Sequence, residues 1–377
     1  MFKFIYILFI VLQSTISLAT DLEFRPIGLE FEYAGSGETL NISKSEGYIS
    51  LLRFVKNKFP GDQIKLLPWN RYSDAMNTKY AFFTDLKGRQ WKVVPEIMTE
   101  DTYDGYELIT PPLNSVNDIE AVSLVLDQIQ NSSLFITGKY SSTHYTADIS
   151  DFISADSNIS KFVDVILFIE NHILEIYHMI QPARYGLVMN TFAVPLSFNQ
   201  RALLTELSSL SRINRTYDNV RNLFLKYQDE EFILSGNENE HRWKFRAFNY
   251  GKFLQLGDFK FSPTLEMRLS DLVDSKDFVL VGRLFEALIR VGSETPSNEF
   301  KDPFSAIDHI NRDQQILLSA ASEHIKTNLN AGTYYDLLKL LDLNPNDYPP
   351  YSRIRLSLIH QTRTQPLQFN SCRSYLH

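Results

Sequence analysis

Apolar and polar residues alternate in several short segments of the chain, and this two-residue period predicts half-buried strands. In the stretch PIGLEFEY, residues 26–33, every odd-numbered position is apolar, whereas Glu30 and Glu32 share the other face. The same alternation occurs in THYTADIS and SPTLEMRLSD, and GYELITPP is interpreted as a strand that Pro111 and Pro112 end. The segment YAFFTDLKGRQWKVVPEI is typical of a hairpin that turns at Lys87 and Gly88. We therefore expect several strands, each with one apolar face.

Longer segments between these strands carry apolar residues at helical spacing. The clearest is residues 159–180, and further helices are expected near residues 115–130, 199–227 and 276–292. From Phe304 to Leu343 the pattern is again helical. Because the strands alternate and the helices between them differ in length, the pattern favours an α+β fold with an antiparallel sheet over a doubly wound fold.

The composition indicates a large globular protein and argues against nucleic acid as a partner. The 377 residues are 44% hydrophobic and 13% aromatic, which is enough for one large domain with a helical appendage. The formal net charge is −8, and the 37 basic residues form no block that would follow a phosphate backbone. A lone cysteine, Cys372, excludes an internal disulfide, so stability must come from the core.

The first residues have the form of a secretory signal. In MFKFIYILFIVLQSTISLAT, one lysine precedes an apolar run from Phe4 to Leu12, and small residues stand at Ser17 and Ala19, as cleavage requires. We expect residues 1–19 to be removed and the protein to be exported, either periplasmic or secreted. An uncleaved anchor is the alternative, although the run is shorter than the ~20 residues that span a bilayer. No other segment is long and apolar enough, so no stable membrane span is expected after cleavage.

Glu30 and Glu32 raise a chemical question, because side chains on one strand face lie about 6.6 Å apart and unpaired carboxylates repel each other. Their partners can be a divalent cation, arginines or water, and a solvated outer face is the plainest alternative. Two later strands each add a carboxylate, Glu107 in GYELITPP and Glu266 in SPTLEMRLSD. Strands that offer carboxylates to a common face build an oxygen-ligand site for Mg²⁺, a hard cation that also takes substrate phosphates as ligands.

Five short segments follow one another in an order that a known family shares. GLEFE is similar to that family's opening G-x-E-x-E strand, and WKVVPEIMTEDTYDGYELITPPL is similar to its W-x-V-x-x-D-x-S … G-x-E-hydrophobic-x-S/T-P-P segment. THYTAD stands where the family has H-V-H-V-D, and QPARYGLVMNTFAVPL resembles its Pro and Arg segment. FRAFNYGKF … SPTLEMR is similar to its R-Y-x-x-x-N … G-T-hydrophobic-E-F-R. Residues 26–290 thus resemble the amidoligase family of the glutamine synthetase and gamma-glutamylcysteine ligase superfamily.

The resemblance implies an ATP-dependent carboxylate–amine ligase that forms an amide or isopeptide bond through an acyl phosphate. Its substrates would be carboxylates and amines of amino acids, peptides or proteins. It implies a curved antiparallel sheet with helices packed on one side, as in the glutamine synthetase catalytic domain. That domain would cover residues 24–295, and residues 300–377 would form a C-terminal helical extension and tail.

The resemblance also implies roles for individual residues, carried over by position. The Mg²⁺ ligands would be Glu30, Glu32, Glu107 and Glu266. The residues that bind ATP would be Arg246, Asn249 and Arg268, and those that act in catalysis would be Arg268, Arg246, His144 and Asp148. Converging carboxylates stay ionised together only when cations lie among them, so we expect both guanidinium groups in the acidic cleft. They would hold phosphate beside the metal or pair with the glutamates directly.

The chain departs from the family pattern at three positions. Thr146 stands in place of a second histidine, and Glu96 and Met98 stand in place of the Asp and Ser of D-x-S. Export raises a further question, because ATP is scarce outside a cytoplasm. The enzyme could act in a second cell after delivery, or the first residues could be something other than an export signal. Alternatively, the chain could be an exported, non-catalytic binding protein that retains the amidoligase-like fold.

Overall fold

The structure is a computed structural model, and it describes the chain in segments. The described residues are 25–35, 44–68, 79–96, 105–132, 134–136, 142–154, 156–180, 196, 198–227, 247–251, 263–271, 275–305, 324 and 330–348. The expected leader, Met98, Arg246 and the C-terminal tail therefore lie outside the described residues.

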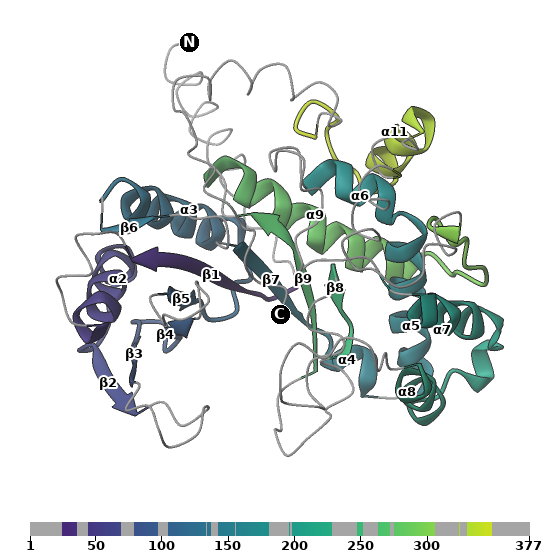
Figure 1. The fold of residues 1–377 in the computed structure, drawn as a ribbon, viewed down its shortest axis with the longest axis horizontal. Helices are drawn as coiled ribbons and strands as arrows, with labels where there is room; N and C mark the ends of the chain where they lie inside the picture. Colours follow the sequence, from purple (N-terminus) through teal and green to yellow (C-terminus); the bar gives the residue numbers. More distant parts are fainter. Residues whose placement is uncertain are drawn as a thin grey trace, which may run out of the picture.

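The described strands form one open, nine-stranded antiparallel sheet (Figure 1). Their order is β2-β3-β4-β5-β1-β7-β9-β8, and β6 pairs with the end of β1. Their bounds are β1 (Ile27–Gly35), β2 (Lys65–Pro68), β3 (Lys79–Thr84), β4 (Gln90–Glu96), β5 (Gly105–Ile109), β6 (Phe135–Ile136), β7 (Ser142–Asp148), β8 (Phe248–Asn249) and β9 (Thr264–Asp271). The expected combination of helices with an antiparallel sheet is confirmed.

One face of the sheet is apolar because alternate side chains of each strand point the same way and match across neighbouring strands. In β1, Leu29 pairs with Tyr145 of β7, and both side chains are buried, as is Phe31. The ring of Phe31 lies 5.3 Å from the ring of Phe278 in helix α9 (Ser275–Glu294). The alternation in the sequence is therefore the burial pattern of the sheet.

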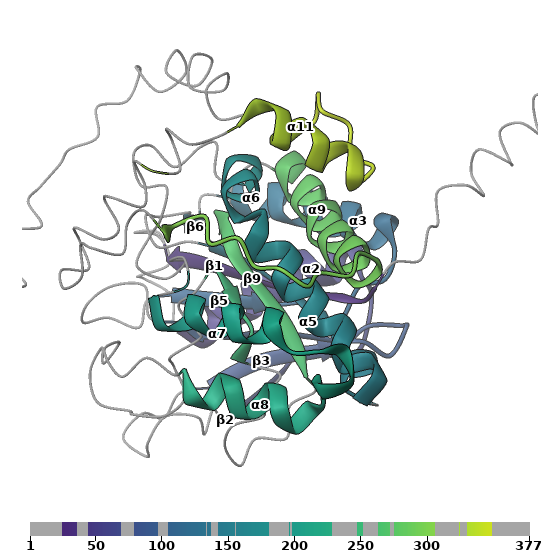
Figure 2. The ribbon, with the colours of Figure 1, turned by 90° about the vertical axis from the view of Figure 1, so that its right-hand side faces the viewer.

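Helices cover that apolar face. Figure 1 shows α2, α3 and α9 along one side of the sheet and α5, α7 and α8 at the end where β8 and β9 lie, and Figure 2 shows these last three helices from that end. The helix bounds are α2 (Lys44–Lys58), α3 (Val116–Gln130), α4 (Ser150–Ile153), α5 (Asp156–Asn171), α6 (Ile173–Ile180), α7 (Phe198–Ser209), α8 (Tyr217–Lys226), α9 (Ser275–Glu294) and α11 (Ala331–Leu340). None of these described helices has the length and apolar character needed to cross a membrane.

The helix expected over residues 159–180 is divided in two. Helix α5 ends at Asn171 and α6 begins after His172. Nδ2 of Asn171 donates to the carbonyl of Glu299 at 3.0 Å, and its Oδ1 accepts from the backbone N–H of Lys301 at 2.8 Å. At this break, the segment that contains Glu299 and Lys301 is hydrogen-bonded to the end of α5.

The helix expected over residues 199–227 is also interrupted. A 3-10 turn at Arg212–Asn214 separates α7 from α8, and the hydroxyl of Thr216 caps the first turn of α8. In the connection Arg215 turns inward, where its Nη1 donates to Oδ1 of Asp164 at 2.8 Å. A buried ion pair between distant segments therefore interrupts a pattern that would otherwise continue as one helix.

The hairpin expected at Lys87 and Gly88 is present between β3 and β4. Gly88 has a φ of 77°, a left-handed conformation that glycine adopts without strain. Asp85 holds the turn, because its Oδ1 accepts from the backbone N–H groups of Lys87 at 2.9 Å and Arg89 at 3.0 Å. The tight turn fixes the register of both strands.

Between Phe304 and Leu343, where the sequence pattern is helical, the described residues include helix α11. The hydroxyl of Tyr334 in this helix donates to the carbonyl of Tyr348 at 2.7 Å. The hydroxyl of Tyr348 donates in turn to the carbonyl of Leu280 in α9, also at 2.7 Å. The described part of the C-terminal region is thus fastened to the helix layer.

Candidate functional site

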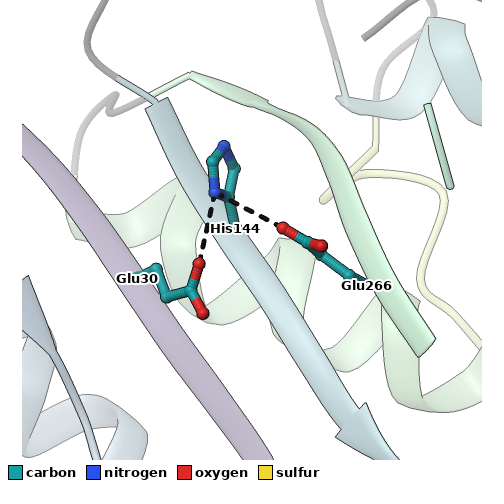
Figure 3. Close-up of side chains that lie close together, drawn as sticks. All are labelled: Glu30, His144 and Glu266. Atoms are coloured by element: carbon teal, nitrogen blue, oxygen red, sulfur yellow. Dashed lines mark ion pairs between the residues drawn. The ribbon is translucent and has the colours of Figure 1, made fainter. Parts of the chain in front are cut away.

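Three side chains from adjacent strands converge on the polar face of the sheet: Glu30 of β1, His144 of β7 and Glu266 of β9 (Figure 3). Glu30 and His144 are direct partners in the antiparallel register. Each residue offers one ligand atom, and these atoms lie within 4.8 Å of one another. We call this group the acidic cluster. Ligand atoms held about 2.1 Å from one small cation are roughly 3–4 Å apart, so a modest closure of the cluster would suffice to hold one.

The imidazole of His144 is the centre of the acidic cluster. Its Nδ1 lies 3.5 Å from Oε2 of Glu30 and 3.6 Å from Oε1 of Glu266. Figure 3 shows both carboxylates directed at this nitrogen. The side chain of Glu266 is 1% exposed and that of Glu30 is 23% exposed. The cluster is therefore reached from solvent on the Glu30 side.

The other ring nitrogen of His144 takes part in a hydrogen-bond relay. Nε2 lies 2.8 Å from Oγ of Ser142, and the hydroxyl of Ser142 donates to Oε2 of Glu32. Because an ionised carboxylate only accepts, the serine oxygen accepts from an N–H at Nε2. In a neutral imidazole, this network places the proton on Nε2, so that Nδ1, which faces Glu30 and Glu266, is available as a ligand atom. A histidine oriented in this way is prepared to bind a metal ion.

Arg268 places a cation inside the acidic cluster. Its Nη1 donates to Oε1 of Glu266 at 2.6 Å and lies 3.4 Å from Nδ1 of His144. Burial alone would lower the pKa of Arg268, but the neighbouring carboxylates, Glu266 first, outweigh this effect and raise the pKa. The guanidinium therefore remains charged and neutralises part of the cluster.

A β-bulge in β9 brings Arg268 to this position. The register of β7 and β9 shifts by one residue around His144, so that two residues of β9 lie opposite the histidine. The backbone N–H of Arg268 donates to the carbonyl of Ala247, beside β8, at 2.9 Å. Bulges commonly redirect side chains next to functional sites.

The remaining expected ligands lie on the same face, beside the cluster. Glu32 and Glu107 are direct partners across β1 and β5. Oε1 of Glu32 is 3.7 Å from Nε2 of His144, on the side of the ring that Ser142 occupies. The structure thus groups all four expected acidic ligands on one face, but the tightest group has His144 with Glu30 and Glu266.

Asn249 of β8 also joins this face. Its Nδ2 donates to Oε2 of Glu266 at 2.9 Å, and its Oδ1 accepts from the backbone N–H of Gly251 at 3.0 Å. The second carboxylate oxygen of Glu266 is therefore held by Asn249, while the first faces Arg268 and His144. Asn249 contacts the cluster from the edge strand of the sheet.

The structure does not bring Asp148, another expected residue, into the cluster. Oδ1 of Asp148 accepts from the backbone N–H of Ser150 at 2.8 Å, which directs the carboxylate to the start of α4. Arg246 lies outside the described residues. Thr146 pairs with Glu266, and its buried hydroxyl has no hydrogen-bond partner among the described residues.

Sequence reasoning does not single out Ser142, although a signal for it exists. Ser142, His144 and Thr146 have the same parity in β7, so they share the polar face. The contact with Glu32 depends on the register between β1 and β7, which the sequence does not display. The relay therefore depends on the pairing of β1 with β7.

The residues of the cluster fit a divalent cation. Two carboxylate oxygens and one imidazole nitrogen converge, and Ser142 and Asn249 orient two of these ligands. Carboxylates suit Mg²⁺ and Mn²⁺, whereas imidazole binds transition metals well. The donor set thus accommodates Mg²⁺ and is also suited to Mn²⁺.

Comparisons with known proteins place the chain in a family. A search of curated proteins gave no match. Among solved structures, the chain is similar to a bifunctional glutathione synthetase from Pasteurella multocida, with a TM-score of 0.38 and 12% sequence identity. That alignment covers 89% of this chain and 48% of the other, so the chain spans about half the length of that protein. A family model described as "Putative amidoligase enzyme" matches residues 25–272, a range that holds the whole acidic cluster, and the chain belongs to this amidoligase family.

Proposed function

We propose that this protein is an ATP- and Mg²⁺-dependent ligase that joins a carboxylate of an amino acid, peptide or protein to an amine. The observation that carries the proposal is the acidic cluster of Glu30, His144 and Glu266 beside Arg268. Membership of the amidoligase family supports the reaction class. An open antiparallel sheet, with one face under helices and the cluster on the other, supports a catalytic domain like that of glutamine synthetase.

The proposed reaction consists of two transfers. The terminal phosphoryl group of ATP passes to the substrate carboxylate, which gives ADP and an acyl phosphate. The amine nitrogen then attacks the acyl carbon, forms the amide and displaces phosphate, and its proton passes to a base or to solvent. A bound divalent cation supplies neutralisation of the phosphate oxygens. Glu30, His144 and Glu266 would hold it, with Glu32 and Glu107 as further oxygen donors.

The other residues of the site would bind and orient. Arg268 would exchange the carboxylate of Glu266 for a phosphate oxygen, because a guanidinium binds both groups in similar geometry. Asn249 keeps the Glu266 carboxylate in place during this exchange. Ser142 keeps the proton of His144 on Nε2, so Nδ1 serves as a ligand atom and not as the base that accepts the amine proton.

The leader-like residues 1–19 support a place outside the cytoplasm of the producing cell. An exported ligase needs nucleotide, so we extend the proposal to delivery into a second cell whose cytoplasm supplies ATP. The presence of the mature protein in a recipient cytoplasm, detected by fractionation, would support this part of the proposal. Retention of residues 1–19 on the purified protein, seen by mass spectrometry, would contradict it.

Two observations favour a second candidate function, a binding protein without ligase activity. Arg268 pairs directly with Glu266 in the cluster, and Thr146 stands where the family pattern has a second histidine. An internal cation in place of a metal would leave a stable site that binds an anionic or peptide ligand without turnover. The metal and nucleotide dependence of stability separates the two functions.

The deciding experiment is thermal unfolding of the full chain with Mg²⁺ and a nonhydrolysable ATP analogue. A ligand at about 100 times its Kd stabilises the folded state by about 2.7 kcal/mol and raises the Tm. We expect Glu30→Gln and Glu266→Gln to lose this shift. The matched control is Glu120→Gln, an exposed glutamate of α3, which should keep it. A wild-type chain without any shift would favour the binding protein.

A further inference from the structure

A lysine–aromatic surface lies on the polar face of the sheet, toward its β2 edge. It consists of Lys65 of β2, Tyr80 and Phe82 of β3, and Lys92 of β4. Phe82 pairs with Lys65 on one side and with Lys92 on the other, and Tyr80 is two residues from Phe82 on the same strand. Antiparallel partners and alternate residues share a face, so all four side chains belong to one surface.

The strand register connects this surface to the acidic cluster. Lys92 pairs with Ile109 of β5, and Ile109 pairs with Glu30 of β1. Strands lie about 4.8 Å apart, so the backbones of Lys92 and Glu30 are roughly 10 Å apart. One line across the sheet therefore leads from the lysine–aromatic surface to the cluster.

Lys92 is a half-buried cation that has no anionic partner among the described residues. No carboxylate in the described part of the chain forms an ion pair with it. Lys65, by contrast, pairs with Asp62 at 3.0 Å, and Lys87 pairs with Asp118 at 3.3 Å. Lys92 therefore offers a cation on this face to which a ligand carboxylate can bind.

The aromatic rings favour a ligand other than a nucleobase. Tyr80 and Phe82 stack on each other, with ring centroids 5.7 Å apart and an interplanar angle of 25°. The ammonium of Lys65 lies over the ring of Phe82, 5.7 Å from its centroid. Tyr80 and Lys65 therefore cover part of the Phe82 ring on which a base would stack, and the rest of the two rings forms an apolar floor beside Lys92.

We propose that Lys92 binds a second carboxylate of an acidic peptide whose reacting carboxylate lies at the acidic cluster. Tyr80 and Phe82 form the apolar floor under the peptide chain. This inference rests on the proposed ligase function and names its carboxylate substrate. An extended peptide advances about 3.4 Å per residue, so the 10 Å between Lys92 and Glu30 correspond to about three residues. A short peptide therefore matches this separation.

The test measures binding of two peptides to the full chain by isothermal titration calorimetry. The probes are Glu-Gly-Glu and Gln-Gly-Glu, which differ only in one side-chain carboxylate. We expect the wild type to bind the first about tenfold more tightly, as is typical for one charge-assisted hydrogen bond. Lys92→Gln should abolish this preference, and Lys92→Arg should keep most of it. The matched control is Lys161→Gln, an exposed lysine of α5 in the helix layer.

Two outcomes would overturn the inference. Equal affinity of the wild type for both peptides would show that no second carboxylate is recognised. A Lys92→Gln variant that keeps the preference but binds the Mg²⁺–ATP analogue more weakly would assign Lys92 to the nucleotide. The proposed function is tested separately: a wild type that binds the nucleotide but does not distinguish the peptides remains a ligase candidate. A chain that distinguishes the peptides through Lys92 but binds no nucleotide has the surface without the ligase function.

Discussion

Nη1 of Arg268 donates to Oε1 of Glu266, 2.6 Å away, on the same strand and the same face of β9. That carboxylate oxygen also faces Nδ1 of His144 at 3.6 Å. The guanidinium and an external divalent cation would therefore bind the same carboxylate. A working ligase requires Arg268 to turn from Glu266 to a phosphate, whereas a binding protein would keep the pair.

Arg268→Ala tests how much the folded state depends on this internal cation. Without the guanidinium, the buried carboxylate of Glu266 loses its cationic partner, and removal of one partner of a buried ion pair costs about 3–5 kcal/mol. We expect the free energy of unfolding, measured in urea with a chelator, to fall by this amount. Added Mn²⁺ should restore part of the loss and should stabilise the variant more than the wild type.

The control for this prediction is Arg268→Lys, which keeps a positive charge and should lose less stability. If Arg268→Ala is as stable as the wild type in the presence of chelator, Arg268 does not neutralise the cluster. Loss of stability that Mn²⁺ cannot restore would show that the cluster of Glu30, His144 and Glu266 does not hold a cation.

Ser142→Ala tests the relay from Glu32 to His144. Loss of the hydroxyl removes the group that keeps the proton of the imidazole on Nε2, and loss of such an orienting contact typically costs about 10–100-fold in metal affinity. We expect weaker Mn²⁺ binding by calorimetry. Ser142→Thr, which keeps a hydroxyl, should restore affinity; unchanged affinity in Ser142→Ala would remove Ser142 from the site.

Asp164 offers a matched pair of ion-pair deletions away from the cluster. It accepts from Arg215 at 2.8 Å and from Arg212 at 2.7 Å, but the side chain of Arg215 is 0% exposed and that of Arg212 is 50% exposed. Arg215→Ala leaves a buried carboxylate with less compensation and should cost about 3–5 kcal/mol. Arg212→Ala removes a solvent-screened partner and should cost less than about 1 kcal/mol. Equal losses in chemical denaturation would contradict this assignment.

The strands could be predicted from the sequence because one face of the sheet is buried. Burial of Leu29 and Phe31 forces the intervening Glu30 to the opposite face, and the same parity carries Glu266 there from β9. Alternation does not reveal which strands are neighbours. The contact between Ser142 and Glu32, and the bulge that brings Arg268 to His144, depend on pairing between distant segments.

Helix α2 shows that tertiary packing also limits the prediction of helices from the sequence. Helix α2 carries Gly47 in its first turn, a residue that disfavours helix in isolation. A Cβ at this position would come within 2.5 Å of the ring of Tyr106 in β5, so packing on the sheet requires the glycine. Local propensity and tertiary packing disagree at Gly47, and sequence reasoning from periodicity omits α2.

Asp85 connects the β3–β4 turn to the start of β4, and its titration predicts how stability changes in acid. Its Oδ2 accepts from Nε of Arg89 at 2.9 Å and from Nε1 of Trp91 at 3.1 Å. Burial alone would raise the pKa of Asp85, but hydrogen bonds from the Arg89 backbone, the Trp91 indole and the Arg89 guanidinium together lower the pKa below its ordinary value. The ionised carboxylate is thus favoured by folding.

A group whose pKa is lowered by folding stabilises the folded state above its unfolded pKa, about 3.9 for aspartate, and this contribution disappears as the pH falls through the lower folded pKa. Asp85→Asn cannot offer two acceptor oxygens, so it should lose about 1–3 kcal/mol in the free energy of unfolding at pH 7. The difference from the wild type should stay constant down to about pH 5 and shrink below about pH 4.

Asp62→Asn provides a comparison with an exposed carboxylate. The pKa of Asp62 is also lowered, chiefly by the backbone N–H of Thr84. The loss of stability in Asp62→Asn should therefore depend on pH in the same direction, but it should be smaller. Urea unfolding across this pH range measures both variants, and a difference for Asp85→Asn that persists undiminished at pH values well below 4 would mean that its charge does not contribute to stability.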